Sequence, residues 1–132
     1  MHWIYSCPHC EATLNPEQRV VLRVESQGRS FLAGFHPQPG VYEVELPPGE
    51  IMAQGSRWEF RCPVCERSLV SDLAADLCAL DVRTDGEVHR VYFSCIAGEE
   101  ATFVVSAEGL LKDYGIHTDR YLEYMVHSKY MR

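Results

Sequence analysis

Two cysteine turns with the same pattern restrict how this chain can fold. Cys7 and Cys10 enclose one Cys-Pro-x-Cys turn, Cys62 and Cys65 enclose another, and 51 residues separate the two turns. A Cys-x-x-Cys turn directs two sulfur atoms toward one point, and two such turns make the tetrahedral four-sulfur cage of a structural zinc site. We therefore expect one metal ion per chain, bound by Cys7, Cys10, Cys62 and Cys65. Thiolates bind zinc or iron, and zinc is the expected ion.

The two turns resemble the knuckles of the zinc-ribbon, or rubredoxin-like, class. The resemblance covers the two Cys-Pro-x-Cys segments and the expected strand at residues 57–61, a small part of the chain. It implies a metal-binding β element and no particular activity, because the class is functionally diverse. Many such knuckles place glycine after the second cysteine, whereas this chain has Glu11 and Glu66 there. A left-handed conformation at these positions would cost roughly 1 kcal/mol in each knuckle.

Other interpretations of the cysteines fit the sequence less well. Cys-Pro-His-Cys also resembles the active-site turn of oxidising thioredoxin-class thiol oxidases, in which a helix N-terminus lowers the pKa of the thiol. That turn needs a strand before it and a long helix after it, yet six residues precede Cys7 and Pro16 soon follows Cys10. The second pair would also have no role. Disulfides are disfavoured because the N-terminal residues do not resemble a signal peptide.

Composition limits the classes of function. The chain has 132 residues, a formal net charge of −7 and no cluster of lysine or arginine. Nucleic-acid affinity depends largely on such cations, so nucleic-acid binding is disfavoured. The sequence contains no apolar stretch of the roughly 18 to 20 residues that a membrane span needs. We expect a single cytoplasmic domain over residues 1–132 that does not contact a membrane.

Alternating apolar residues predict antiparallel strands. They occur at residues 19–25 and 30–35, and again at residues 41–46. The strongest hairpin region is residues 77–105, with a turn at Asp85-Gly86. If Thr84 lies opposite Glu87, Cys78 faces Phe93, and Cys95 lies two positions beyond on the same side. Cys78 and Cys95 are then expected to be buried packing residues, out of register for a disulfide.

Helices are expected mainly at the C-terminus. Ser71 could also cap a short helix at residues 71–77. A helical segment is expected at residues 106–130, made of one helix from Ser106 to Asp113 and a second from about residue 120 to residue 129. The resulting fold class is α+β: antiparallel strands, an embedded zinc ribbon and a C-terminal helix. We expect no internal repeat beyond the two knuckles.

Aromatic and methionine side chains gather near the C-terminus. They could form a surface for a protein partner or a second copy, since such residues are typical of interface cores. They could instead form a wide core face. Tyr121 and Tyr124 are expected on one side of the helix, away from a docked stripe of Leu122, Met125 and Val126. The residues in question are Tyr114, Tyr121, Tyr124, Tyr130, Met125 and Met131.

No catalytic or cofactor-binding constellation is evident beyond the cysteines. The six histidines form no pair at metal-ligand spacing, and nothing resembles a phosphate loop or a nucleophile elbow. The leading hypothesis is a zinc-stabilised, cytosolic protein-binding or adaptor module. One alternative is an enzyme of unrecognised type with a structural zinc and a cleft beside the ribbon. A weaker alternative is a nucleic-acid-binding zinc ribbon.

Overall fold

A computed structural model describes residues 2–126, whose regular secondary structure is mainly antiparallel β-strand with one short α-helix. This agrees with the expectation of a mainly antiparallel β fold. The strands are β1 (Ile4–Ser6), β2 (Val20–Ser26), β3 (Arg29–Phe35), β4 (Val44–Glu45), β5 (Glu59–Arg61), β6 (Leu77–Thr84), β7 (Glu87–Ser94), β8 (Thr102–Ser106) and β9 (Gly109–Tyr114). A 3₁₀ turn, η1 (Thr118–Arg120), precedes the helix α1 (Leu122–Met125).

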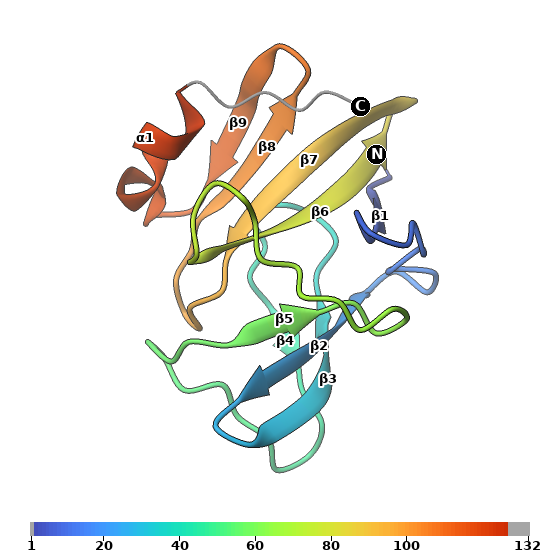
Figure 1. The fold of residues 1–132 in the computed structure, drawn as a ribbon, viewed down its shortest axis with the longest axis vertical. Helices are drawn as coiled ribbons and strands as arrows, with labels where there is room; N and C mark the ends of the chain where they lie inside the picture. Colours follow the sequence, from blue (N-terminus) through green and yellow to red (C-terminus); the bar gives the residue numbers. More distant parts are fainter. Residues whose placement is uncertain (1, 127–132) are drawn as a thin grey trace.

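The strands form two sheets, which are seen as an upper and a lower layer in Figure 1. One sheet has the order β1-β6-β7-β8-β9 and the other has the order β4-β3-β2-β5. The larger core includes Val24 and Phe60 of the four-stranded sheet and Val82 of the five-stranded sheet. A second, smaller core contains Phe103 of β8 and Met125 of α1. The helical segment therefore packs against the five-stranded sheet.

Two hairpins have the same kind of two-residue turn. Gln27 and Gly28 join β2 to β3 with φ values of 49° and 81°, and Asp85 and Gly86 join β6 to β7 with values of 51° and 80°. Two successive positive φ values are typical of a type I′ turn, whose twist matches that of the strands. In the second hairpin Cys78 pairs with Phe93 and Thr84 pairs with Glu87, as the sequence predicted.

The expectation that the chain has no repeat beyond the knuckles is wrong. Residues 3–14 align with residues 58–69 at six identical positions of twelve. After that, the pairs of β2 with β3 match those of β6 with β7 when 58 is added to each residue number. The third pairs match as well: Gly34 opposite Glu45 corresponds to Tyr92 opposite Phe103. We call residues 3–45 the first unit and residues 58–103 the second unit.

Each unit gives its first strand to the sheet of the other. β1 of the first unit pairs with β6 of the second, and β5 of the second unit pairs with β2 of the first. The registers are equivalent, because Tyr5 lies opposite Val82 and Phe60 lies opposite Val24. Reciprocal contacts of this kind are expected of two similar bodies related by a two-fold operation. The exchange brings the two knuckles together, since each follows an exchanged strand directly.

The segment after the second unit differs from the prediction. A helix was expected from Ser106 to Asp113, whereas Gly109–Tyr114 forms the strand β9 and pairs with β8. The hydroxyl of Ser106 accepts a hydrogen bond from the backbone N–H of Glu108 at 3.1 Å, so it stabilises a tight turn instead of capping a helix. All of β8 is buried, and pairing its outer edge with β9 satisfies backbone groups that a helix would leave unpaired.

The other expected helices are also shorter or absent. Residues 71–76 form an irregular turn before β6, in which the Ser71 hydroxyl accepts a hydrogen bond from the N–H of Ala74 at 3.3 Å. The expected helix at residues 120–129 is represented by η1 and α1, and its end at residues 127–129 lies outside the described residues. We call residues 109–126 the C-terminal appendage. Across residues 2–126, every helix is too short or too polar to cross a membrane.

Candidate metal centre

The two knuckles have the same backbone geometry. The N–H of Glu11 donates to the carbonyl of Cys7 at 2.9 Å, and the N–H of Glu66 donates to the carbonyl of Cys62 at 2.9 Å. Both glutamates have a φ of 63°, in the left-handed region. Many other knuckles have glycine at this position after the second cysteine. A glutamate in this conformation carries a strain of roughly 1 kcal/mol.

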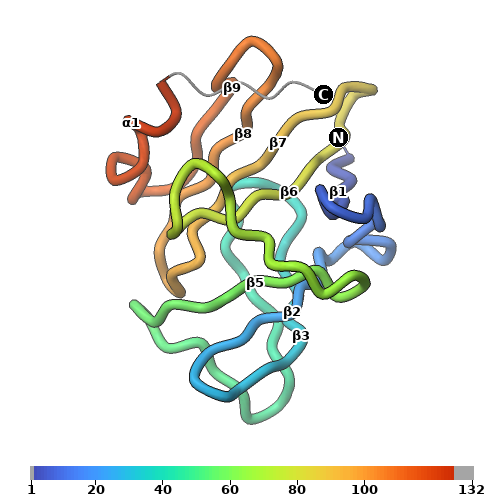
Figure 2. Tube along the Cα trace, in the orientation of Figure 1, coloured from blue at the N-terminus to red at the C-terminus, as the bar shows by residue number. Residues whose placement is uncertain are grey.

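The four sulfur atoms converge on one point. The Sγ atoms of Cys7, Cys10, Cys62 and Cys65 all lie within 4.8 Å of one another. Across the two knuckles, Cys7 Sγ lies 3.8 Å from Cys65 Sγ, and Cys10 Sγ lies 3.7 Å from Cys62 Sγ. A tetrahedral ion with metal–sulfur bonds of about 2.3 Å has sulfur–sulfur edges of about 3.8 Å. The arrangement therefore fits a four-coordinate metal ion. Figure 2 shows the two knuckle loops, in dark blue and yellow-green, on the same side of the molecule.

The surroundings of the sulfurs differ within each knuckle and match between knuckles. Cys7 and Cys62 are both fully buried, whereas Cys10 is exposed and Cys65 is half-buried. Burial raises the pKa of the Cys7 thiol to about 12 and also raises the pKa of Cys62. The N–H of His9 points to Cys7 Sγ at 3.3 Å, which favours the thiolate in part. A bound cation would supply the remaining compensation for negative charge in this buried site.

The equivalent amide in the other knuckle makes the equivalent contact. The N–H of Val64 lies 3.3 Å from Cys62 Sγ. The pKa of Cys65 is lowered, chiefly by a backbone hydrogen bond from Arg67. Amide hydrogen bonds to sulfur are a common means of orienting metal-ligating thiolates. The site thus holds two buried and two more accessible sulfurs, with one of each from either knuckle.

His9 lies in the first knuckle but does not belong to the ligand set. Its Nε2 lies 3.0 Å from the carbonyl oxygen of Ser68, which follows the second knuckle. The ring therefore connects the two knuckles beside the cage. With four protein sulfurs around one point, a metal ion would have no open position for substrate. The arrangement is suited to a structural ion that holds the two units together.

The two remaining cysteines are packing residues. Cys78 and Cys95 are each 3% exposed, and all six cysteines of the chain are free. Burial raises the pKa of both thiols, so they stay protonated and unreactive near neutral pH. Cys78 occupies the position of Val20 in the first unit, which supports the prediction of an apolar role.

The C-terminal aromatic residues do not form the expected single surface. Tyr121 is 2% exposed and packs edge-on against Phe103 with ring centroids 6.4 Å apart, so it belongs to the core, and the expectation that it lies away from the docked side is wrong. Met125 is also buried, whereas Tyr124 and Val126 are 43% and 70% exposed. Tyr121 and Met125 are four residues apart, and they form the docked side. Tyr130 and Met131 lie outside the described residues.

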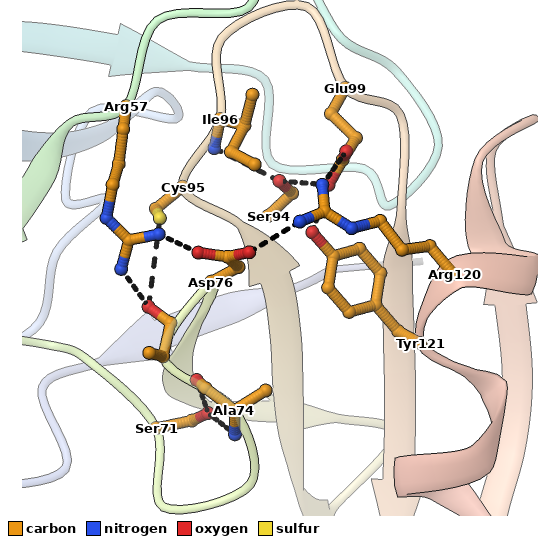
Figure 3. A network of polar contacts seen from close by, with 11 residues as sticks. Arg57, Ser71, Ala74, Asp76, Ser94, Cys95, Ile96, Glu99, Arg120 and Tyr121 are labelled. Atoms are coloured by element: carbon orange, nitrogen blue, oxygen red, sulfur yellow. Dashed lines mark hydrogen bonds and ion pairs between the residues drawn. The ribbon is translucent and has the colours of Figure 1, made fainter.

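A polar network fixes the C-terminal appendage to the second unit, and sequence analysis missed it. Figure 3 shows Asp76 between the guanidinium groups of Arg57 and Arg120. Arg120 donates to Asp76 at 2.6 Å and to Glu99 at 2.8 Å, and Arg57 also pairs with Asp76. The hydroxyl of Tyr121 donates to Glu99. These residues are far apart in the chain and follow no motif, so only the fold brings them together.

The network sets the charge state of Glu99. Burial alone would raise the pKa of this carboxyl, but hydrogen bonds from Ser94 and Tyr121 outweigh that effect and lower the pKa. The guanidinium of Arg120 lowers it further. The same burial, together with the hydrogen bond to Glu99, raises the pKa of Tyr121 to about 12. Glu99 is therefore an anion near neutral pH and Tyr121 is its neutral donor.

Comparisons with known proteins give no family for this chain. No protein-family model, no curated protein and no solved structure matches it significantly. The conclusions on function therefore depend on the residues and their geometry.

Proposed function

We propose that the chain is a zinc-stabilised protein-binding module that works in the cytosol. In this proposal one zinc ion per chain holds the two units together, and Cys7, Cys10, Cys62 and Cys65 are its ligands. The cage of four sulfurs, with cross-knuckle edges of 3.8 and 3.7 Å, supports a closed structural site. The six free thiols are consistent with a reducing compartment.

The uneven distribution of exposed apolar side chains carries the proposal of a protein partner. Eleven large apolar side chains are exposed among the described residues, and five of them belong to the C-terminal appendage. Apolar side chains gathered in one region are typical of interaction sites, whereas scattered ones need no explanation. The five are Leu110, Leu111, Ile116, Tyr124 and Val126.

The position of β9 gives this region a second means of recognition. β9 is the last strand of the five-stranded sheet, so one of its edges has no partner strand within residues 2–126. Four central residues of β9, including Leu110 and Leu111, are exposed. An extended segment of another protein could add to such an edge through backbone hydrogen bonds, with the leucines supplying apolar contact. The appendage has no counterpart in the first unit, so the four-cysteine site that joins the two units does not need it.

Site-specific photo-crosslinking in cells tests the proposal. A photoreactive phenylalanine analogue replaces Leu111 in one variant and Ile51 in the other, since both are exposed apolar residues. We expect a discrete crosslinked protein from position 111 and none from position 51. The double variant Leu110→Asp/Ile116→Asp, carrying the same probe, should lose the product while keeping its fold and metal content.

The mass of the product identifies the occupant. A product of twice the chain mass would indicate a second copy, and any other mass would indicate a different protein. Equal crosslinking from positions 111 and 51, or a product that survives the double substitution, would contradict the proposed surface. The enzyme alternative needs converging polar groups without partners, and the polar network of the described residues is internally paired.

A further inference from the structure

A cavity lies between the two sheets, away from the metal ligands and the appendage surface. Its volume is about 130 Å³. The walls are mostly apolar and come from both units, with equivalent residues facing one another, such as Leu22 and Leu80. Segment 36–44, which we call the covering segment, contributes further lining residues, including Pro39 and Val41.

The deeper polar groups around the cavity already have partners within the protein. The Tyr5 hydroxyl donates to the carbonyl of Pro37 at 2.6 Å. The hydroxyls of Tyr42 and Thr102 lie 2.8 Å apart and share a hydrogen bond. Water in this space would find few groups to bind, and a water molecule needs two to four polar partners to be stable in a protein interior. The cavity is therefore better suited to an apolar molecule than to water.

The covering segment is held by side-chain hydrogen bonds of Tyr5 and Tyr42 and, at its end, by the pairing of Val44 with Phe35. The hydroxyl of Tyr5 binds the carbonyl of Pro37, and the hydroxyl of Tyr42 binds Thr102, so both tyrosines attach the segment to the five-stranded sheet. Within the segment, the backbone hydrogen bond from the N–H of Val41 to the carbonyl of Gln38 is long, at 3.2 Å. Val41 is only half-buried although it lines the cavity, so it lies where the cavity approaches solvent. A ligand could enter here without separating the two sheets.

We propose that this cavity binds one uncharged molecule of about the size of a single aromatic ring. An apolar cavity of about 150 Å³ accommodates benzene in another protein, so a volume of about 130 Å³ is sufficient for a ring of that size. An anionic ligand is disfavoured because the carboxylates of Glu43 and Glu99 line the cavity, and a cation gains little there because Glu99 is already paired with Arg120. This inference does not depend on the protein-binding proposal, since it concerns different residues.

Methyl NMR spectroscopy of the metal-loaded full chain tests the inference with toluene as the probe and benzoate as its charged counterpart. We expect saturable shifts of the methyl groups of Val20, Leu22, Leu80, Val91 and Ala101 with toluene and none with benzoate. The substitution Val41→Trp should weaken toluene binding at least ten-fold by filling the entrance. Ile51→Trp, at an exposed position outside the cavity, should leave it unchanged.

A second measurement keeps the test decisive if Val41→Trp does not fold. Nuclear Overhauser contacts between toluene protons and the protein should appear at the methyl groups of these five cavity residues in the unmodified chain. Contacts at exposed methyl groups such as Leu111 and Ile116 instead would overturn the inference. The absence of shifts at the cavity methyl groups up to the solubility limit of toluene, or equal affinity in a folded Val41→Trp variant, would do so as well.

Discussion

The first and second units have the same strand pairing, but only the second has both faces of its sheet covered. In the second unit Ala79, Tyr92 and Phe103 are buried beneath the appendage. The equivalent positions of the first unit are Val21, Gly34 and Glu45, which are half-buried or exposed. The apolar outer face of the second unit is thus covered by the appendage, and the first unit has no such segment. The strands and knuckles that both units share build the four-cysteine site, whereas the appendage carries the gathered exposed apolar residues.

The two units also use one structural position for different purposes. Ser94 and Glu99 of the second unit join the network that anchors Arg120. Their equivalents in the first unit are His36 and Val41. All four residues line the cavity, but only the pair in the second unit belongs to such a network. Because the two units have the same strand arrangement, this difference between them comes from their side chains. Substitutions at equivalent positions therefore separate what the shared architecture requires from what each unit adds.

The largest expected effect comes from removing a buried ligand. Cys7→Ser and Cys62→Ser should each abolish metal binding and lower the free energy of unfolding by more than about 4 kcal/mol, because each removes the ion that joins the two units and leaves the other buried cysteine without a cation. The matched control Cys78→Ser changes only packing and should cost about 1 to 2 kcal/mol. Metal analysis and denaturant unfolding measure both effects. Unequal losses from Cys7 and Cys62 would break the equivalence of the two knuckles.

The exchanged strands should give the next largest effect. Phe60→Ala and Tyr5→Ala each remove a buried ring from equivalent places, and each should cost about 3 to 4 kcal/mol. Tyr5→Phe removes only the hydrogen bond to Pro37 and should cost about 1 kcal/mol. Chemical denaturation of the metal-loaded variants tests these values. A negligible cost for either alanine variant would mean that the exchanged strand does not hold that unit.

The network should give the second unit an acid-sensitive contribution to stability that the first unit lacks. The pKa of Glu99 is lowered in the folded state, so its contribution is present above the unfolded-state pKa and is lost as the pH falls through the folded-state value. Glu99→Gln should reduce the free energy of unfolding by about 1 to 2 kcal/mol at pH 7. Val41→Leu at the equivalent position is the control.

The difference between wild type and Glu99→Gln should shrink as the pH falls below about 4, the usual range of a glutamate in an unfolded chain. Hydrogen exchange of the amides of η1 and α1 should increase in this variant at pH 7 and stay unchanged in Val41→Leu. A stability difference that does not vary with pH would show that the carboxylate charge contributes nothing.

The smallest effect should be a gain in stability. Glu66 and Glu11 have φ values of 63°, a conformation that glycine adopts without steric strain. Glu66→Gly and Glu11→Gly should each raise the free energy of unfolding by about 0.5 to 1 kcal/mol at full metal occupancy. The gain is limited because glycine also increases the entropy of the unfolded chain. Thermal unfolding at matched metal content would detect it, and a loss in both variants would contradict this assessment of strain.

Local chemistry made the knuckles and hairpins predictable. Cys-x-x-Cys spacing determines where sulfurs point, and Asp85-Gly86 determines the register from Thr84 to Cys78. The same kind of reasoning failed for residues 106–113, where Ser106 as a capping residue suggested a helix. The buried strand β8 needed a partner at its outer edge, and that tertiary requirement outweighed the local preference.

The repeat could not be recognised from strand residues alone. Only five positions of residues 20–46 are identical to those of residues 78–104, among them the two hairpin glycines and Phe35 with Phe93. Apolar alternation is preserved while the outward residues diverge, because one sheet face is exposed and the other is covered. Tyr121 was misassigned for a related reason: its partners Phe103 and Glu99 are distant in sequence.

X-ray absorption spectroscopy of the purified chain tests the central claim most directly, because it reports the metal and its ligands together. The account predicts about one zinc ion per chain with four sulfur neighbours at about 2.3 Å and no nitrogen neighbour. An iron spectrum with four sulfur neighbours would support the same four-cysteine site with iron in place of zinc. A folded chain without metal, or a shell in which histidine nitrogen replaces a cysteine sulfur, would contradict the account.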